Sequence, residues 1–292
     1  MPTSAQLKEH YDTHGYVIIP GLLTPSEHAD LLAATDRVVA RTRSGSWPHA
    51  RVVGKQFPPY GVGDDIWGVQ HAMHPALEEP VFARWYAGDA VRGAAEMLLG
   101  CQDEDLQMEL FNILVNPVRS EFALCWHRDD IKGSASEDEE RAALTVRHYG
   151  VQWNTALHED VSLYVVPGSH RVPRTAVQRA LSNDTAAPAD PLAMPGAIGV
   201  KLRVGETVFY NNNILHCASY SPNIPRATLH ACMGDTRGGS ARARNILQHD
   251  LGWMKEEAFR ESLNLKGRQM LERLVRMQEE YHGKDIEYSL EE

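Results

Sequence analysis

Apolar positions recur with a helical period near both ends of the chain and with a strand period in its middle. Toward the N-terminus the pattern predicts, in order, a helix over 4–13, a buried strand over 16–19, a helix from 25 to about 42, a long loop over 44–65 and mostly helical structure over 76–99. The second helix carries a start signal, because Thr24 can cap it, Pro25 fits its first position and Glu27 can close a capping box.

The middle of the chain consists of segments that mix apolar and polar positions as strands do. These segments are 106–115, 122–126, 151–157, 163–166, 198–204, 206–210 and 227–233. Turn signals separate them at Asn116-Pro117, Pro167-Gly168 and Val204-Gly205. A run of short strands of this kind is typical of a β-sandwich or a barrel.

Two excursions and a tail complete the pattern. The acidic segment 133–141 predicts a solvated loop, and 182–196, rich in Pro, Ala and Asp, predicts another loop. From about 255 to 282, apolar residues fall on one helical face: Leu265, Met270, Leu271, Leu274, Met277 and Tyr281. This face is expected to pack against the core or against a second subunit. Because no repeat or linker-like segment interrupts the chain, we expect one domain.

Composition and charge exclude several classes of protein. The 292 residues are 43% hydrophobic, which is enough for a sizeable core, and 29 basic against 39 acidic residues give a net charge of −10. This balance opposes a nucleic-acid or anionic-membrane partner. No stretch approaches the roughly eighteen apolar residues of a membrane span, and the polar N-terminus lacks the apolar segment of a signal peptide. Four scattered cysteines without a CxxC pair fit a reduced, cytoplasmic protein.

Fourteen histidines stand out in this acidic chain, and four of them begin an H-x-D tripeptide. Two His and one carboxylate on one face of an ion form the ligand set of mononuclear iron oxygenases. Residues i and i+2 point the same way in a strand but diverge on a helix, so context decides between the four. His10/Asp12 and His28/Asp30 fall in predicted helices and are expected to be solvated, and His158/Asp160 is expected in a polar hairpin turn. His127/Asp129, at the end of an apolar strand, is the preferred pair.

The third ligand has to come from a distant part of the chain, and His216 is the best candidate. It follows the turn and strand of 205–210, and Arg226 opens the next apolar strand ten residues later. A hairpin between 206–210 and 227–233 would bring Arg226 beside the cavity, where its guanidinium could bind a dicarboxylate end-on. The spacing leaves the ordinary alternatives open: a hydrogen-bonded core histidine and a surface ion pair. His170 is expected to order a turn and His230 to pack within its strand.

These motifs together resemble the phytanoyl-CoA dioxygenase (PhyH) family of non-haem iron, 2-oxoglutarate-dependent oxygenases. The resemblance rests on WHRDD (126–130), VVPGSHR (165–171), GETVFYNNNILH (205–216) and Arg226, and it runs from about residue 8 to about 235. HGYVIIPGLLTPSE (14–27) is similar to the opening of that family.

The resemblance implies a mainly β fold with flanking helices, a double-stranded β-helix (jelly-roll, cupin-like). One domain would comprise an N-terminal part (1–105), a jelly-roll core (106–250) and a helical tail (251–292). The family's iron ligands fall on His127, Asp129 and His216, and its 2-oxoglutarate-binding arginine falls on Arg226. Fe(II), 2-oxoglutarate and O2 would be used to hydroxylate or otherwise oxidise a small organic metabolite, with release of succinate and CO2.

The sequence also departs from the family pattern. The segment 155–170 is shorter than usual and lacks an Asn-Gly turn, and Ala218 stands where a small hydroxyl residue is common. Some cosubstrate contacts must therefore differ, and Asn154 and Asn112 are the predicted polar contacts. Asp129, in place of Gly or Ala, argues against a halogenase.

Two other classes of function remain open at this stage: a catalytically silent barrel that binds a small ligand, and a zinc-dependent hydrolase with the same ligands. Metal analysis together with succinate release distinguishes the three hypotheses. The expected partner is a small molecule, and homo-oligomerisation through the C-terminal helix is possible. The Arg-rich stretch 37–51 could meet an anion, but a solvated helix end and loop is the preferred interpretation.

Overall fold

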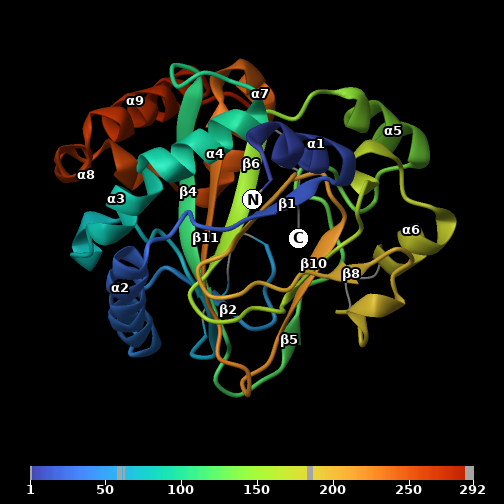
Figure 1. Ribbon diagram of the computed structural model, residues 1–292, viewed down its shortest axis with the longest axis horizontal. Helices are drawn as coiled ribbons and strands as arrows, with labels where there is room; N and C mark the ends of the chain where they lie inside the picture. The colour runs from blue at the N-terminus through green and yellow to red at the C-terminus, as the bar shows by residue number, and fades with distance from the viewer. Residues whose placement is uncertain (1, 58–60, 62, 183–186, 287–292) are drawn as a thin grey trace.

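Two antiparallel sheets form the core of the computed structural model, which describes residues 2–57, 61, 63–182 and 187–286. The larger sheet has the strand order β1-β9-β6-β11-β4-β3-β2, and the smaller has the order β5-β10-β7-β8. Figure 1 shows the long strands β4, β6 and β11 side by side, with β5, β10 and β8 across from them. The mainly antiparallel jelly-roll with flanking helices is confirmed.

The elements have the following bounds. The helices are α1 Ser4–His14, α2 Pro25–Arg43, α3 Val81–Tyr86, α4 Asp89–Leu99, α5 Glu137–Thr145, α6 Ala176–Ser182, α7 Gly239–Ile246, α8 Glu257–Ser262 and α9 Leu265–Glu280. The strands are β1 Tyr16–Ile19, β2 Ala50–Val52, β3 Ile66–Val69, β4 Leu106–Val115, β5 Phe122–Ala123, β6 Gly150–Ala156, β7 Leu163–Val165, β8 Ile198–Gly199, β9 Thr207–Tyr210, β10 His216–Tyr220 and β11 Ala227–Asp235. Single-turn 3-10 helices link several of them.

Apolar side chains from both sheets meet between them, as in a sandwich whose inner faces interdigitate. One cluster joins Val208 of β9 to Leu163 and Val165 of β7, and another joins Leu114 of β4 to Tyr220 of β10. Each strand therefore presents alternate residues to this interior. The polar side chains that interrupt the interior are the ones that line the candidate site.

The C-terminal tail packs against the outer face of the large sheet, beside β4 (Figure 1). Met270, Leu271, Leu274 and Met277 of α9 are buried, but Leu265, at the start of the helix, is 69% exposed. Arg273 donates to the carbonyl of Leu106 at 2.8 Å. The prediction of a buried helical face is thus confirmed except at Leu265, and homo-oligomerisation through this helix stays a prediction. Among the described helices, none is both long and apolar enough to span a bilayer.

Several local predictions need correction. The predicted loop 44–65 contains β2, whose Arg51 pairs in register with Gly68 of β3, and neither strand was predicted. Both are short, so periodicity carries little information there. Strand β10 begins at His216 and was also missed. The predicted strand 198–204 shortens to β8. The predicted loop 182–196 includes a 3-10 turn at Pro191–Ala193, and its residues 183–186 lie outside the described part of the chain.

The acidic segment 133–141 is not a solvated loop throughout, because α5 begins at Glu137. Ser136 caps the helix and forms a capping box with Glu139. Glu140 is 0% exposed and lies against three arginine side chains. In the sequence, the run of acidic residues gives no indication of this arrangement, because the three arginines that meet Glu140 come from other segments of the chain.

The predicted hairpin between 206–210 and 227–233 is wrong in its pairing. β9 pairs with β1 and β6, whereas β11 pairs with β4 and β6, so these two strands are not neighbours. Between them the chain crosses to the small sheet as β10 and then returns. Arg226 nevertheless reaches the interior, because this return places it at the beginning of β11.

A cluster of aromatic rings and imidazoles connects the N-terminal part to the C-terminal tail. The His71 ring lies 4.9 Å from that of His49 and 5.7 Å from that of Trp253, measured between ring centroids. Burial, followed by the neighbouring histidines and Arg51, lowers the pKa of His71 to about 3. His71 also has a positive φ of 59°. The folded protein therefore holds a neutral imidazole in a conformation that Asn also tolerates.

We expect acidification to destabilise the protein through this group. The pKa of His71 in the folded state is about 3 against 6.5 unfolded, so between these values the unfolded chain binds the extra proton. Stability should be lost as the pH falls below 6.5, by about 1.4 kcal/mol for this one histidine at about pH 5.5. Urea unfolding of the wild type and His71→Asn at about pH 7.5 and 5.5 measures the difference. An unchanged pH dependence in the variant would contradict the assignment.

Candidate metal centre

The two candidate histidines are directly paired at the start of β10, in the small sheet. His127 and His216 form an antiparallel bridge, in which each backbone N–H donates to the carbonyl of the other at 3.0 Å. Their ring centroids lie 4.2 Å apart. The backbone N–H of Asp129 donates to the carbonyl of Asn212 at 2.8 Å, which ties the carboxylate to the segment that leads into His216. Residues far apart in the sequence are thus held together by main-chain bonds.

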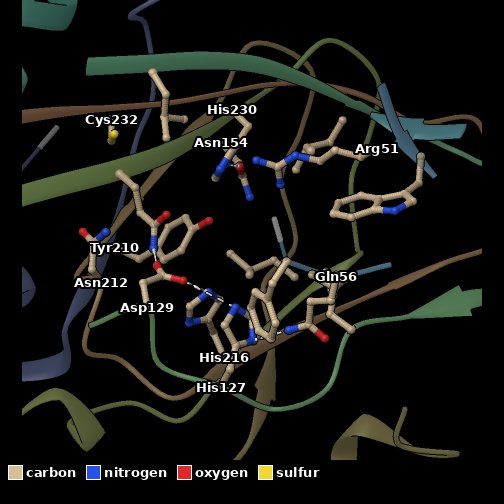
Figure 2. A pocket seen from close by; sticks show the side chains of 18 of the residues that line it. Arg51, Gln56, His127, Asp129, Asn154, Tyr210, Asn212, His216, His230 and Cys232 are labelled. Carbon is tan, nitrogen blue, oxygen red and sulfur yellow. Dashed lines mark hydrogen bonds and ion pairs between the residues drawn. The ribbon is translucent and has the colours of Figure 1, made fainter. Parts of the chain in front are cut away.

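Figure 2 shows the side chains of His127, Asp129 and His216 converging at the base of one pocket. One ligand atom from each residue lies within 4.8 Å of the others. Asp129 Oδ1 is 3.4 Å from His127 Nε2 and 3.8 Å from His216 Nε2. Within the described residues, this is the one group of three or more His, Cys, Asp or Glu with metal-binding geometry.

Contacts behind the triad orient its rings toward a common point. Nδ1 of His127 lies 2.8 Å from the carbonyl of Cys125, and Nδ1 of His216 lies 2.9 Å from the carbonyl of Ile214. A proton on each Nδ1 would donate to these carbonyls and leave each Nε2 lone pair facing Asp129. Outer bonds of this kind are typical of metal-binding histidines.

The electrostatics keep the triad in the protonation state that a cation needs. Burial would raise the pKa of Asp129, but His216, His127 and Gln152, whose amide donates to Oδ2, hold it well below its usual range. Burial and the neighbouring His127 lower the pKa of His216 to about 4. A carboxylate and a neutral imidazole are the ligand forms of these groups.

Arg226 lines the same pocket as the triad and is 4% exposed. Its Nε donates to Asp160 Oδ2 at 3.2 Å, and Thr228 Oγ1 donates to the same oxygen at 2.9 Å. The guanidinium carbon lies 4.4 Å from the ring centroid of Tyr220. Nη1 and Nη2 have no hydrogen-bond partner in the described part of the chain. Two buried donors left unsatisfied at the end of a pocket are the arrangement that an anionic ligand would complete.

The role of Asp160 corrects the interpretation of its tripeptide as a polar turn. The side chain is 4% exposed, and it also accepts from the backbone N–H of Ser162 at 2.8 Å. Asp160 is therefore the buried counter-ion of Arg226. The pattern H-x-D gave no sign of this role, because the partner lies 66 residues further along the chain.

Of the two predicted asparagines, one lines the pocket and the other does not. Asn154 lines the pocket, with Oδ1 2.9 Å from His230 Nδ1. Asn112 does not contribute to the pocket lining and instead accepts a bond from the backbone N–H of His71 at 3.1 Å. Contact of either with a cosubstrate stays a prediction, but the geometry favours Asn154.

Sequence reasoning missed several lining residues, among them Gln152 and, labelled in Figure 2, Gln56, Tyr210 and Arg51. Strand alternation could have found Gln152, which is two residues before Asn154 on β6. Arg51 could not be found in this way, because its short strand was not recognised. It is 8% exposed, with its guanidinium 5.2 Å from the ring centroid of Trp67, so the preferred interpretation of a solvated loop fails at this arginine.

The other histidines agree with their predicted roles only in part. His230 lines the pocket rather than only packing within its strand, and so does His249. His170 Nε2 lies 3.1 Å from the carbonyl of Asp12, which joins the Pro-Gly-Ser-His turn to α1. His10 and Asp30 lie on predicted helices that the structure confirms, and both are exposed. The prediction of a solvated His28 is wrong, because this side chain is half-buried and its Nε2 lies 2.9 Å from the carbonyl of Leu157.

The family model of phytanoyl-CoA dioxygenase (PhyH) matches residues 11–224, most of the chain. The chain belongs to this family. The match spans the loop that carries His127 and Asp129 and the first residue of β10, His216, and it ends just before Arg226. Since PhyH proteins are iron- and 2-oxoglutarate-dependent oxygenases, this member is an enzyme of that class.

Solved structures of the same fold include three iron- or 2-oxoglutarate-dependent proteins. EctD from S. alaskensis, with bound Fe, has a TM-score of 0.58 at 19% identity, covering 81% of this chain and 78% of that one. The epimerase SnoN from nogalamycin biosynthesis has a TM-score of 0.54 at 20% identity, covering 80% of this chain and 81% of that one. EvdO2 from Micromonospora carbonacea var. aurantiaca, complexed with 2-oxoglutarate, has a TM-score of 0.54 at 18% identity, covering 80% of this chain and 92% of that one. At such identities the likeness shows the fold alone. No curated protein matches the chain.

Proposed function

We propose that this PhyH member binds Fe(II) through His127, Asp129 and His216 and 2-oxoglutarate through Arg226, and that it oxidises a small organic molecule. When bound, the iron and 2-oxoglutarate supply the O2-activating chemistry, and 2-oxoglutarate leaves as succinate and CO2. The protein supplies binding, orientation and exclusion of side reactions.

The observation that carries this proposal is the pairing of two features within one pocket. The triad lines this pocket, and so does Arg226, whose Nη1 and Nη2 are unsatisfied. A dicarboxylate that chelates a metal through one end and meets a guanidinium at the other would satisfy both. A zinc hydrolase with the same ligands gives no reason for a buried arginine with two free donors.

Residues of this chain hold both ends in place. Asp160 accepts from Arg226 Nε and is itself held by the hydroxyl of Thr228, so the guanidinium is fixed through Nε and its two Nη groups remain available to a ligand. Gln152 donates to Asp129 and holds the oxygen that does not face the histidines. Leu110, Leu114, Leu124 and Leu163 contribute apolar side chains to the lining of the same pocket.

The remaining lining indicates where a substrate can enter. The pocket opens to solvent, and it has about 800 Å³ of empty space when the open solvent at its mouth is counted. Gln56, Asn245 and Gln248 add polar groups that can fix the orientation of a small organic molecule.

Metal exchange with succinate release as the readout tests the proposal. Protein stripped with a chelator should release no succinate from 2-oxoglutarate, Fe(II) with O2 should restore release, and Zn(II) should not. Activity that returns with Zn(II) and needs no 2-oxoglutarate would favour the hydrolase. If neither metal nor 2-oxoglutarate binds, the silent ligand-binding barrel is correct.

A further inference from the structure

We propose that Glu140 is a positioning residue for the metal centre, acting through Arg128, the residue between His127 and Asp129. This inference rests on the proposed metal site but concerns a part of the chain outside the pocket. Neither residue lines the pocket, and neither can coordinate an ion bound by the triad.

Arg128 turns away from the pocket and bonds to two other segments. Its Nη1 donates to the carbonyls of Ser169, at 2.7 Å, and Asn213, and its Nη2 donates to the carbonyl of Val172 at 3.0 Å. The side chain is 3% exposed. The guanidinium therefore joins the loop of His127 and Asp129 to the turn at 169–172 and to the segment that leads into His216.

These hydrogen bonds fix the relative position of the two segments that carry the candidate ligands. The backbone of 127–129 is already paired to His216 and Asn212, so the two ligand-bearing segments have one relative register. Arg128 adds a third link, to Asn213, from the face opposite the metal. With all three links in place, neither ligand segment can shift without breaking buried hydrogen bonds.

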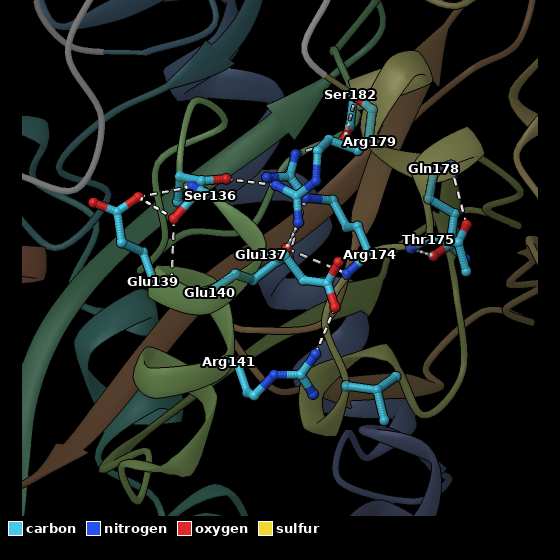
Figure 3. A network of polar contacts seen from close by, with 12 residues as sticks. Ser136, Glu137, Glu139, Glu140, Arg141, Arg174, Thr175, Gln178, Arg179 and Ser182 are labelled. Carbon is cyan, nitrogen blue, oxygen red and sulfur yellow. Dashed lines mark hydrogen bonds and ion pairs between the residues drawn. The ribbon is translucent and has the colours of Figure 1, made fainter.

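Glu140 supplies the counter-charge that keeps Arg128 in this position. Its Oε1 accepts from Arg128 Nε at 2.8 Å and from Arg174 Nε at 3.1 Å, and its Oε2 accepts from Arg179 Nη2 at 2.6 Å. Figure 3 shows Arg174 and Arg179 reaching toward α5 from the segment that follows the turn. One fully buried carboxylate thus meets three guanidinium groups.

Removing this one negative charge would leave three arginines close together without it. Breaking a buried ion pair by deleting one partner is costly, because the remaining charge loses its compensation. Arg128 and Arg174 are both buried, so repulsion cannot be relieved by solvent without movement of their segments. For Arg128, that movement displaces the backbone between the two ligands.

The test compares Glu140→Gln with two matched variants by Mn(II) titration, followed by EPR of the free ion, without cosubstrate. Glu140→Gln should weaken Mn(II) binding by about 10- to 100-fold, the range for outer-shell partners of a metal site. Glu137→Gln, on the exposed face of the same helix, should leave it unchanged. Arg179→Gln removes a partner of Glu140 that does not touch the ligand loop, and should lower the melting temperature with less than a twofold change in Mn(II) binding.

A binding constant for Glu140→Gln within twofold of the wild type overturns the proposal, as does an equal loss in Arg179→Gln, which would indicate general loosening. If Glu140→Gln does not fold, Arg128→Lys replaces it. Lysine keeps a charge for Glu140 but cannot also reach both carbonyls, so Mn(II) binding should weaken at least tenfold, and unchanged binding again overturns the proposal. A wild type that binds no Mn(II) contradicts the proposed function instead.

Discussion

Asp129→Ala is expected to lower the conversion of 2-oxoglutarate to succinate by more than about 100-fold, beyond the range for outer-shell partners of a metal site. The carboxylate is the one anionic group of the triad, and its pKa is held well below its usual range, so it stays charged at neutral pH. Succinate release with Fe(II) and O2, measured without any added substrate, gives the activity. A Mn(II) titration of the same variant should show a parallel loss of metal binding.

The chain provides a matched control in another H-x-D tripeptide. Asp30→Ala removes the same group at the same spacing from a histidine, but Asp30 is exposed on α2. This variant should keep wild-type turnover and metal binding. Full turnover in Asp129→Ala, or an equal loss in both variants, would show that the triad does not hold the catalytic metal.

Arg226→Ala is expected to raise the KM for 2-oxoglutarate by about 30- to 1000-fold, equivalent to about 2–4 kcal/mol for a lost pair of charge-assisted hydrogen bonds. The reason is that Nη1 and Nη2 are the buried donors with no partner in the described chain. Kinetics over a wide range of 2-oxoglutarate should show that kcat recovers in part at high concentration. A KM unchanged from the wild type would exclude this arginine as the cosubstrate anchor.

The same substitution also leaves Asp160 buried without its cation, which costs about 3–5 kcal/mol of folding stability. The double variant Arg226→Ala/Asp160→Asn separates the weaker binding of 2-oxoglutarate from the loss of folding stability. The double variant removes the orphaned charge while Thr228 and the backbone of Ser162 can still donate to residue 160. We expect its melting temperature to recover and its KM for 2-oxoglutarate to stay high.

The strand segments and the candidate ligand pair, His127 and Asp129, were accessible from the sequence because both depend on local pattern. β4, β6 and β11 are long and keep their alternation over many residues, so their existence could be predicted. His127 and Asp129 were preferred over the other tripeptides because an apolar segment precedes them, but the predicted strand 122–126 shortens to β5, and residues 127–129 follow it outside any strand. His216 was accessible from the turn and strand before it.

The predictions that failed depended on partners far away in the chain. The 44–65 segment looked like a loop because β2 and β3 are short, and this concealed Arg51 among the lining residues. The hairpin assumed for Arg226 was wrong, although its conclusion held, because sequence proximity does not reveal that β10 crosses to the other sheet.

By itself, the sequence determined the all-β core and the family and indicated the candidate metal ligands, since hydrophobic period and motif order are properties of the chain. Only the tertiary structure decided which charges are buried and which groups meet. Asp160 beside Arg226 and Glu140 among three arginines both look like solvated acids in the sequence. A carboxylate is stable in the interior only where cations converge on it, and that convergence is set by the fold.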